Sequence, residues 1–249
     1  MKLINIGCGH NYHSDWVNLD LHRSEHVKYY NAKNKLPFSS DSIDAIYHSH
    51  FLEHINKTLA EKFIADCYRV LKKGGVIRVV VPNLEIICLE YLKNLKKGYD
   101  NNDKIAILNY QWNKLELFDQ VIRQKKGGQM LSTLRKGEFN PDYVFYRNGE
   151  EIEPLLRYAQ KNDNKIFRFF KNIIDIFKST NPQKSGEAHR WMYDKLDLKI
   201  LLESVGFRNF KVLRYDQSKI KDWNKYALDK AKNKNRARKP DSIFCEAEK

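Results

Sequence analysis

The chain has 249 residues, enough to bury a full hydrophobic core, and we expect one α/β domain with an insertion. It carries 45 Lys and Arg against 31 Asp and Glu, a formal net charge of +14. No apolar run is long enough to cross a membrane, and the first residues already form a predicted strand, so we expect a cytoplasmic protein without a signal peptide. The four cysteines (Cys8, Cys67, Cys88 and Cys245) lack metal-ligand spacing, which predicts reduced thiols and excludes a disulfide framework.

The positive charge is unevenly distributed along the chain. Residues 1–92 hold 11 Lys and Arg against 10 Asp and Glu, whereas residues 93–187 hold 18 against 12. A late segment, residues 225–239, holds 7 against 1. This pattern suits a phosphate-bearing or acidic substrate, a nucleic acid or an anionic membrane surface. It suits equally well a solvated face in a chain that is rich in Lys and Asn throughout.

The N-terminus contains the most informative pattern. An apolar run over residues 3–6 stops at Gly7 and Gly9, which predicts a buried strand followed by a tight turn that a ligand can approach closely. A second predicted strand, residues 16–20, ends on the carboxylate of Asp20. This arrangement is typical of dinucleotide-type sites, in which the acid accepts hydrogen bonds from ribose hydroxyls. The third glycine of the nicotinamide fingerprint is missing, and a plain strand-to-helix turn explains the two glycines equally well.

The rest of the chain alternates predicted strands and helices. Strands are expected over 27–32, 43–47 and 76–82, and a helix over 58–71 with residues 72–75 as its stop signal. Helical spacing follows over 85–95 and 105–122. The C-terminal part predicts a helix over 196–205 ended by Gly206, then strands over 207–214 and 242–247. Between these parts, residues 166–178 form an apolar stretch edged with cations, typical of an interfacial membrane helix, the core of a cap or a dimer face.

Six segments in order resemble the class I S-adenosylmethionine-dependent methyltransferases, and in particular predicted members found among glycan and cell-surface polysaccharide genes. These segments are residues 7–9, 16–20, 36–38, 52–54, 69–75 and 79–82. The resemblance resumes at about residue 186 and runs to the C-terminus. It implies a Rossmann-like α/β fold with a mainly parallel seven-stranded sheet and a C-terminal antiparallel hairpin. It divides the chain into a methyltransferase domain (1–92 and 187–249) and a mostly helical insertion (93–186) for capping, dimerisation or substrate binding.

The resemblance also implies a cofactor, S-adenosylmethionine, with S-adenosylhomocysteine as its product. Gly7 and Gly9 are expected to cradle the methionine part, and Asp20 to bind both ribose hydroxyls. Asn31 is expected to accept from the adenine amino group, and Leu36 to pack on adenine. The full set of implied cofactor-binding residues is Gly7, Cys8, Gly9, Asp20, Asn31, Ala32, Leu36, Ser49 and His50.

Methyl transfer to a hydroxyl needs a base within hydrogen-bond reach of that hydroxyl, and histidine is the side chain best suited near neutral pH. The predicted catalytic residues are His189 and His50, with His48 and His54 as further candidates. His189 is favoured because the resemblance places residues 189–191 over the mouth of the active site, although the family residue there can also bind substrate. The predicted substrate contacts are Gln129, Arg190 and Tyr193, with Arg190 suited to clamping a phosphate or carboxylate. No metal site is expected.

The sequence therefore predicts a methyltransferase that acts on a sugar hydroxyl of a cell-surface glycan or of a nucleotide- or lipid-linked precursor. An RNA methyltransferase is an alternative, but the late basic segment offers few aromatic rings for base stacking. A non-catalytic scaffold that binds the cofactor is another. The expected partners are a small-molecule or glycan acceptor, with or without a phosphate, and a second copy of the chain. A peripheral contact of residues 163–178 with the inner face of the membrane is also expected, and nucleic acid is less favoured.

Overall fold

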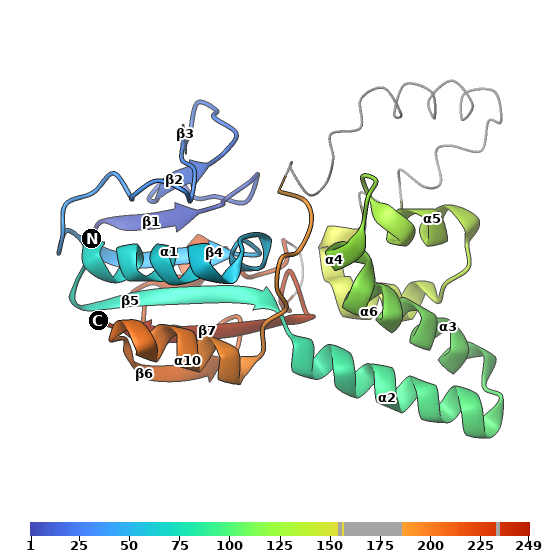
Figure 1. Cartoon of the computed structure of the whole chain (residues 1–249). Helices are drawn as coiled ribbons and strands as arrows, with labels where there is room; N and C mark the ends of the chain where they lie inside the picture. Colours follow the sequence, from blue (N-terminus) through green and yellow to red (C-terminus); the bar gives the residue numbers. More distant parts are fainter. Residues whose placement is uncertain (154–155, 157–185, 233–234) are drawn as a thin grey trace. The chain divides into compact units, whose positions relative to one another are not determined.

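A computed structural model describes residues 1–153, 156, 186–232 and 235–249 (Figure 1). The chain forms two compact units. The sheet unit comprises Met1–Asn83, Arg190–Ala237 and Ser242–Lys249, and the helical unit comprises Leu84–His189 and Arg238–Asp241. The predicted helix at 166–178 and the predicted membrane contact at 163–178 lie outside the described residues. The predicted division at 93–186 stays a prediction.

The sheet unit is built on seven strands in the order β3-β2-β1-β4-β5-β7-β6. The strands are β1 (Leu3–Ile6), β2 (Val17–Asp20), β3 (Val27–Tyr29), β4 (Ile43–Ser49), β5 (Leu71–Pro82), β6 (Arg208–Leu213) and β7 (Ser242–Glu248). The pairs among β1 to β5 are parallel, whereas β7 runs antiparallel to both β5 and β6. The predicted Rossmann-like class I methyltransferase fold, with its antiparallel C-terminal hairpin, is confirmed by this strand order.

Two helices cover one face of the sheet, α1 (Lys57–Val70) and α10 (Lys195–Val205) (Figure 1). Alternate strand residues such as Ile46, Ile77 and Val79 point toward them and form the larger hydrophobic core. Each helix begins at a side-chain cap. The Asn56 oxygen accepts the Leu59 N–H at 2.8 Å, and Asp194 accepts two N–H groups of the first turn of α10.

The opposite face of the sheet is covered by the chain between β6 and β7, which includes one short helix, α11 (Trp223–Tyr226). Its aromatic side chains pack on Trp16 and Tyr47, with Trp16 and Tyr226 ring centroids 5.3 Å apart and Tyr47 and Trp223 centroids 5.4 Å apart. The part of the late basic segment that the structure describes therefore contributes to the core, with Tyr226 and Leu228 buried and several of its lysines exposed.

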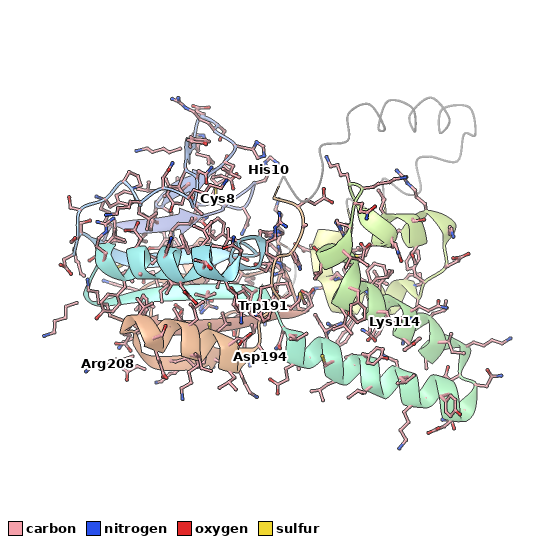
Figure 2. The ribbon with its side chains drawn as sticks, in the orientation of Figure 1. Cys8, His10, Lys114, Trp191, Asp194 and Arg208 are labelled. Atoms are coloured by element: carbon pink, nitrogen blue, oxygen red, sulfur yellow. The ribbon has the colours of Figure 1, made fainter. Side chains whose placement is uncertain are left out.

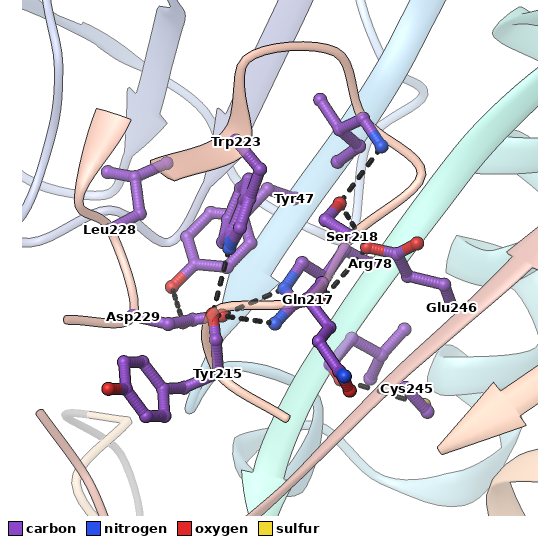
Figure 3. A network of polar contacts seen from close by, with 12 residues as sticks. Tyr47, Arg78, Tyr215, Gln217, Ser218, Trp223, Leu228, Asp229, Cys245 and Glu246 are labelled. Carbon is purple, nitrogen blue, oxygen red and sulfur yellow. Dashed lines mark hydrogen bonds and ion pairs between the residues drawn. The ribbon is translucent and has the colours of Figure 1, made fainter. Parts of the chain in front are cut away.

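A buried arginine fixes this covering segment to the sheet (Figure 3). Arg78 in β5 is fully buried, and its guanidinium lies 2.8 Å from the carboxylates of both Asp229 and Glu246. It also donates to the backbone carbonyls of residues 214, 215 and 217. The guanidinium carbon lies 4.5 Å from the centroid of the Trp223 ring, and Tyr47 donates to Asp229 at 2.6 Å. Arg78 thus connects β5, a central strand, to two separate parts of the covering segment, residues 214–217 and Asp229.

Several predicted boundaries were wrong. Helix α1 ends at Val70, and the predicted stop signal at 72–75 lies inside β5, because the fully buried Leu71 is already extended and pairs with Ile43. Gly74 and Gly75 continue the ladder by exchanging backbone hydrogen bonds with Lys249. The third strand ends at Tyr29, since a turn at residues 31–34 follows, in which the Asn31 side chain accepts the Lys33 N–H.

The helical unit contains α2 (Leu84–Asn101), α3 (Lys104–Lys114), a π-helical turn η2 (Leu115–Asp119), α4 (Gln120–Ile122), α5 (Gly128–Lys136) and α6 (Pro141–Asn148). The helix predicted over 105–122 is therefore divided into α3, η2 and α4. The hydrophobic core of the helical unit includes Trp112, Leu134 and Val144. No helix in the described part of the chain is both long and apolar enough to cross a membrane.

The π-helical turn places two acidic side chains in the interior of the helical unit. Glu116 lies 3.1 Å from Arg147 and accepts from Asn113, and Asp119 lies 2.7 Å from Arg123. Asp119 also accepts the N–H of Gln129, so it caps the start of α5. The burial of Glu116 raises its pKa to about 7, a rise that Arg147 limits but does not cancel.

Replacement of Arg78 by Met is expected to lower the free energy of unfolding by about 3–5 kcal/mol, because two buried carboxylates lose their counter-charge. Urea unfolding followed by tryptophan fluorescence measures this change. The matched control is Arg214→Ala, which removes an exposed ion pair with Asp216 and is expected to change stability little. Equal effects of the two substitutions would contradict the central role of Arg78.

The stability of the helical unit is expected to depend on pH through Glu116. Its pKa is higher in the folded than in the unfolded state, so its protonated form stabilises the fold at low pH and this stabilisation is lost as pH rises from about 4.5 to about 7. Amide hydrogen exchange in α3 and α6 measures the trend after correction for intrinsic exchange rates. Glu116→Gln should flatten it, whereas an unchanged slope in that variant would assign the pH dependence to another group.

Candidate functional site

The loops that follow β1, β2 and β4 meet at the carboxyl edge of the sheet, where ligands bind in open α/β folds. The loop after β1 carries Cys8 and His10 (Figure 2) and reaches β2 through turns, with no helix between the two strands. The Gly7 N–H donates to the Leu19 carbonyl at 2.8 Å, which continues the hydrogen bonding of β1 and β2 into the loop. The backbone at residues 7–9 is thereby fixed next to the end of β2.

The two glycines of this loop serve different purposes. Both adopt left-handed backbone angles, with φ of +64° at Gly7 and +51° at Gly9. A Cβ on Gly7 would lie 2.4 Å from Cδ2 of Phe51, so Gly7 lets the segment after β4 pack against the loop. A Cβ on Gly9 would meet no atom within 4 Å. The open side of Gly9 is therefore where a ligand can lie against the backbone.

Asp20 is held beside this open backbone. One carboxylate oxygen accepts the Gly9 N–H at 2.9 Å, and the other accepts the His22 N–H at 3.0 Å. Each oxygen keeps a further lone pair, so the carboxylate can accept two additional hydrogen bonds. This geometry fits a ribose, whose two neighbouring hydroxyls present two donors.

Cys8 lies between the two glycines, and its side chain is directed into the protein. Burial, together with the charge of Asp20, raises the pKa of the thiol to about 12. The thiol therefore stays protonated at neutral pH and donates weakly to the Gly9 carbonyl. The side chain of Cys8 is buried, so the backbone is the part of this residue that a ligand can reach.

Two buried asparagines, in β1 and β2, hydrogen-bond to the loop between these strands. This role was not predicted from the sequence. Asn5 donates to the Asn11 carbonyl and lies 3.3 Å from the Asn18 side-chain oxygen. Asn18 donates to the carbonyls of His13 and Trp16. The signal for this role is a polar residue inside each of two apolar strand runs, because a buried amide must find partners.

The predicted adenine-side residues lie in and after the turn that follows β3. The side-chain oxygen of Asn31 already accepts the Lys33 N–H at 3.0 Å, which leaves its amide N–H groups and one lone pair for a ligand. Ala32 is partly exposed. Leu36 is only 2% exposed and packs in the main core, so its side chain offers almost no surface to an adenine ring.

In the segment after β4, His50 lies beside two polar side chains, Glu53 from the same segment and Ser242 from the distant strand β7. His50 has a left-handed backbone, with φ of +52°, and its N–H donates to the Val80 carbonyl. Its Nε2 lies 2.7 Å from Oγ of Ser242 at the start of β7. Its Nδ1 lies 3.3 Å from Oε1 of Glu53, whose side chain is completely buried. Ser49, which precedes His50, ends β4 and is partly exposed. Ser49 and His50 were predicted from the sequence, whereas Glu53 and Ser242 were not.

The other candidate histidines have different surroundings. His48 is completely buried against Phe51 and Phe63, and burial lowers its pKa to about 3, so it is neutral and inaccessible. His54 is partly exposed, with its Nε2 4.0 Å from the Glu53 carboxylate. His189 is buried, and its backbone N–H donates to the Gln120 carbonyl within the helical unit.

The three predicted substrate contacts differ in solvent exposure and in the unit that carries them. Arg190 is exposed, and its N–H donates to the Glu53 carbonyl, which places it next to the segment after β4. Tyr193 is 3% exposed and belongs to the main core, so it supports the fold at this edge. Gln129 is exposed in the first turn of α5, in the helical unit.

Comparison with known families matches residues 12–79 to a family described as a methyltransferase domain. A S-adenosylmethionine-dependent methyltransferase from Thermotoga maritima, described as a possible histamine N-methyltransferase, is 13% identical, with 100% of this chain and 82% of that chain covered and a TM-score of 0.42. A S-adenosylmethionine-dependent methyltransferase from Archaeoglobus fulgidus is 13% identical, with 100% and 86% covered and a TM-score of 0.42. Comparison with curated proteins gives no significant match.

The family match and the strand order support the predicted cofactor, S-adenosylmethionine. The residues at the carboxyl edge fit this group. Gly9 leaves space for it against the backbone, and Asp20 presents two oxygens with free lone pairs beside that space. When bound, the cofactor supplies an electrophilic methyl group.

Replacement of Gly7 by Ala is expected to be more destabilising than replacement of Gly74, although both have positive φ. Gly74→Ala should cost about 1–2 kcal/mol for the left-handed backbone alone. Gly7→Ala should cost about 1–3 kcal/mol more, because its Cβ would meet Phe51. Urea unfolding of both variants measures the difference, and equal costs would show that the Phe51 contact does not constrain the loop.

Proposed function

We propose that this protein is a S-adenosylmethionine-dependent methyltransferase that transfers a methyl group to a sugar hydroxyl. The observation that carries the proposal is the Asp20 carboxylate, fixed by the Gly9 N–H at 2.9 Å at the carboxyl edge of a class I methyltransferase sheet. The match of residues 12–79 to a methyltransferase domain supports the same activity.

The residues of the sheet unit have separate tasks in this proposal. Asp20 accepts the ribose hydroxyls, and the backbone at Gly7 and Gly9 lies along the methionine part. The amide of Asn31 contacts the adenine edge. Ser49 and His50, one strand away at the end of β4, face the reacting end of the site. Because the cofactor supplies the electrophile, the protein mainly aligns the acceptor and removes its proton.

The sugar acceptor is proposed from charge and from family resemblance. Arg190 is exposed beside the segment after β4, and its planar guanidinium suits bidentate binding of a phosphate or carboxylate on a glycan precursor. The late basic segment is the strongest argument for nucleic acid, but its Tyr226 and the nearby Trp223 are buried in the core instead of being offered for base stacking. This burial favours a sugar acceptor over RNA.

Two roles stay predictions. These are His189 as a base or substrate contact and Gln129 as a substrate contact. A homodimer and a peripheral membrane contact also stay predictions.

Replacement of Asp20 by Ala is expected to weaken binding of S-adenosylmethionine and S-adenosylhomocysteine at least tenfold, because one charge-assisted hydrogen bond to a hydroxyl contributes about 1.5–3 kcal/mol. Calorimetric titration of the purified protein with each compound measures this loss. Asp15→Ala is the matched control, since Asp15 is an exposed aspartate whose carboxylate pairs with Lys225. Absence of binding to the unsubstituted protein would favour the scaffold alternative, and equal binding by Asp20→Ala would remove Asp20 from the cofactor site.

A further inference from the structure

We infer that Ser242, His50 and Glu53 form a proton-accepting chain for the methyl acceptor, with His50 as the base and Glu53 as the residue that positions it. The inference rests on the proposed function for its substrate, but its geometry stands by itself. The three residues come from the start of β7, the end of β4 and the 3₁₀ turn η1 (Leu52–His54), all within the sheet unit.

The partners of the imidazole determine which nitrogen is basic. Nδ1 lies at an ion-pair distance of 3.3 Å from Oε1 of Glu53, without hydrogen-bond geometry, and the negative charge of an ionised Glu53 favours a proton on this nitrogen. In the neutral ring Nε2 is then the acceptor, and the Ser242 hydroxyl at 2.7 Å donates to it. Both contacts therefore agree on one tautomer, with the lone pair on Nε2 directed toward Ser242.

The burial of Glu53 strengthens the effect of its charge on the His50 ring. The Glu53 side chain has no exposed surface, whereas the His50 side chain keeps 16% of its surface exposed. A charge shielded from water stabilises a neighbouring imidazolium more strongly than an exposed one. Further titratable groups of the sheet unit near Glu53 include His54, whose Nε2 lies 4.0 Å from the same oxygen, and Tyr193, whose pKa is raised by burial and by the charge of Glu53. Glu53 thus stabilises the cation that forms when His50 takes up a proton.

The backbone holds the imidazole in place. His50 adopts a left-handed conformation that is uncommon for a residue with a side chain, and its N–H is tied to β5 through the Val80 carbonyl. Phe51, the next residue, packs where a Cβ on Gly7 would lie. The histidine is therefore fixed at the same edge of the sheet as the proposed cofactor backbone site.

The proton balance follows from this chain. As the acceptor oxygen bonds to the methyl carbon and the carbon–sulfur bond breaks with its electron pair left on sulfur, the acceptor proton passes to Oγ of Ser242. The Ser242 proton passes to Nε2 of His50. The resulting imidazolium faces the Glu53 carboxylate and later releases its proton to water. His50 and Ser242 move the proton, and Glu53 is a positioning residue.

The test is long-range ¹H–¹⁵N spectroscopy of the whole protein with ¹⁵N-labelled histidine and no added ligand, from about pH 5 to about pH 9. The His50 signals are assigned by their loss in His50→Gln. We expect the neutral ring to carry its proton on Nδ1. In Glu53→Gln the ring should titrate at least about one pH unit lower, because the imidazolium loses its counter-charge. Glu61→Gln, an exposed change of the same type in α1, should leave the titration unchanged.

Ser242→Ala should shift the Nε2 resonance, whereas Ser204→Ala, which alters an exposed serine of α10, should not. A proton on Nε2 in the neutral wild-type ring would overturn the chain even if Glu53→Gln fails to fold. An unchanged His50 titration in a folded Glu53→Gln would remove Glu53 as the positioning residue. Calorimetry with S-adenosylmethionine is the separate test of the proposed function. Folded Glu53→Gln and Ser242→Ala should each bind the cofactor as the wild type does.

Discussion

The structure of the sheet unit depends on the guanidinium of Arg78. A sheet needs cover on both faces, and here one face has helices whereas the other is covered mainly by the chain between β6 and β7. An irregular segment leaves carbonyls without ladder partners, and Arg78 satisfies three of them while its charge is balanced by Asp229 and Glu246. A buried charge of this kind does not by itself add stability, but it makes one arrangement of the covering segment strongly preferred.

The chain between β6 and β7 also contacts the loop of the candidate site. Asn11, in the loop after β1, donates to the Leu228 carbonyl at 2.8 Å, and the rings of His13 and Tyr226 are in edge contact. Arg78 binds Asp229, the neighbour of Leu228, and so holds the part of the segment that this loop contacts. From the other side, Asn5 and Asn18 fix the loop from the strands. The backbone that a cofactor would contact is supported by these contacts instead of by a helix between β1 and β2.

The polar groups at the carboxyl edge are divided between two tasks. Asp20 lies next to Gly9 at the β1–β2 side, where its oxygens are held by backbone N–H groups and face outward. His50 lies at the β4 side, with a buried carboxylate on one nitrogen and a hydroxyl on the other. In the proposed function, cofactor binding falls to the loops after β1 and β2 and proton removal to the segment after β4, so that cofactor affinity and proton transfer can be measured separately.

The sequence by itself was enough to predict the fold class. Apolar runs, glycines and an acid at the end of a strand are local features, and they indicated most of the strands and helices, whereas the family resemblance implied the mainly parallel seven-stranded sheet that the structure confirms. The cofactor contacts of Gly7, Gly9 and Asp20 stay predictions. Tertiary structure alone showed that Leu36 and Tyr193 are core residues, because burial depends on what packs from elsewhere. It also decided which histidine has a carboxylate and a hydroxyl beside it. Ser242 lies 192 residues from His50 in the chain, and no spacing rule connects them; the antiparallel return of β7 beside β5 brings them within 2.7 Å.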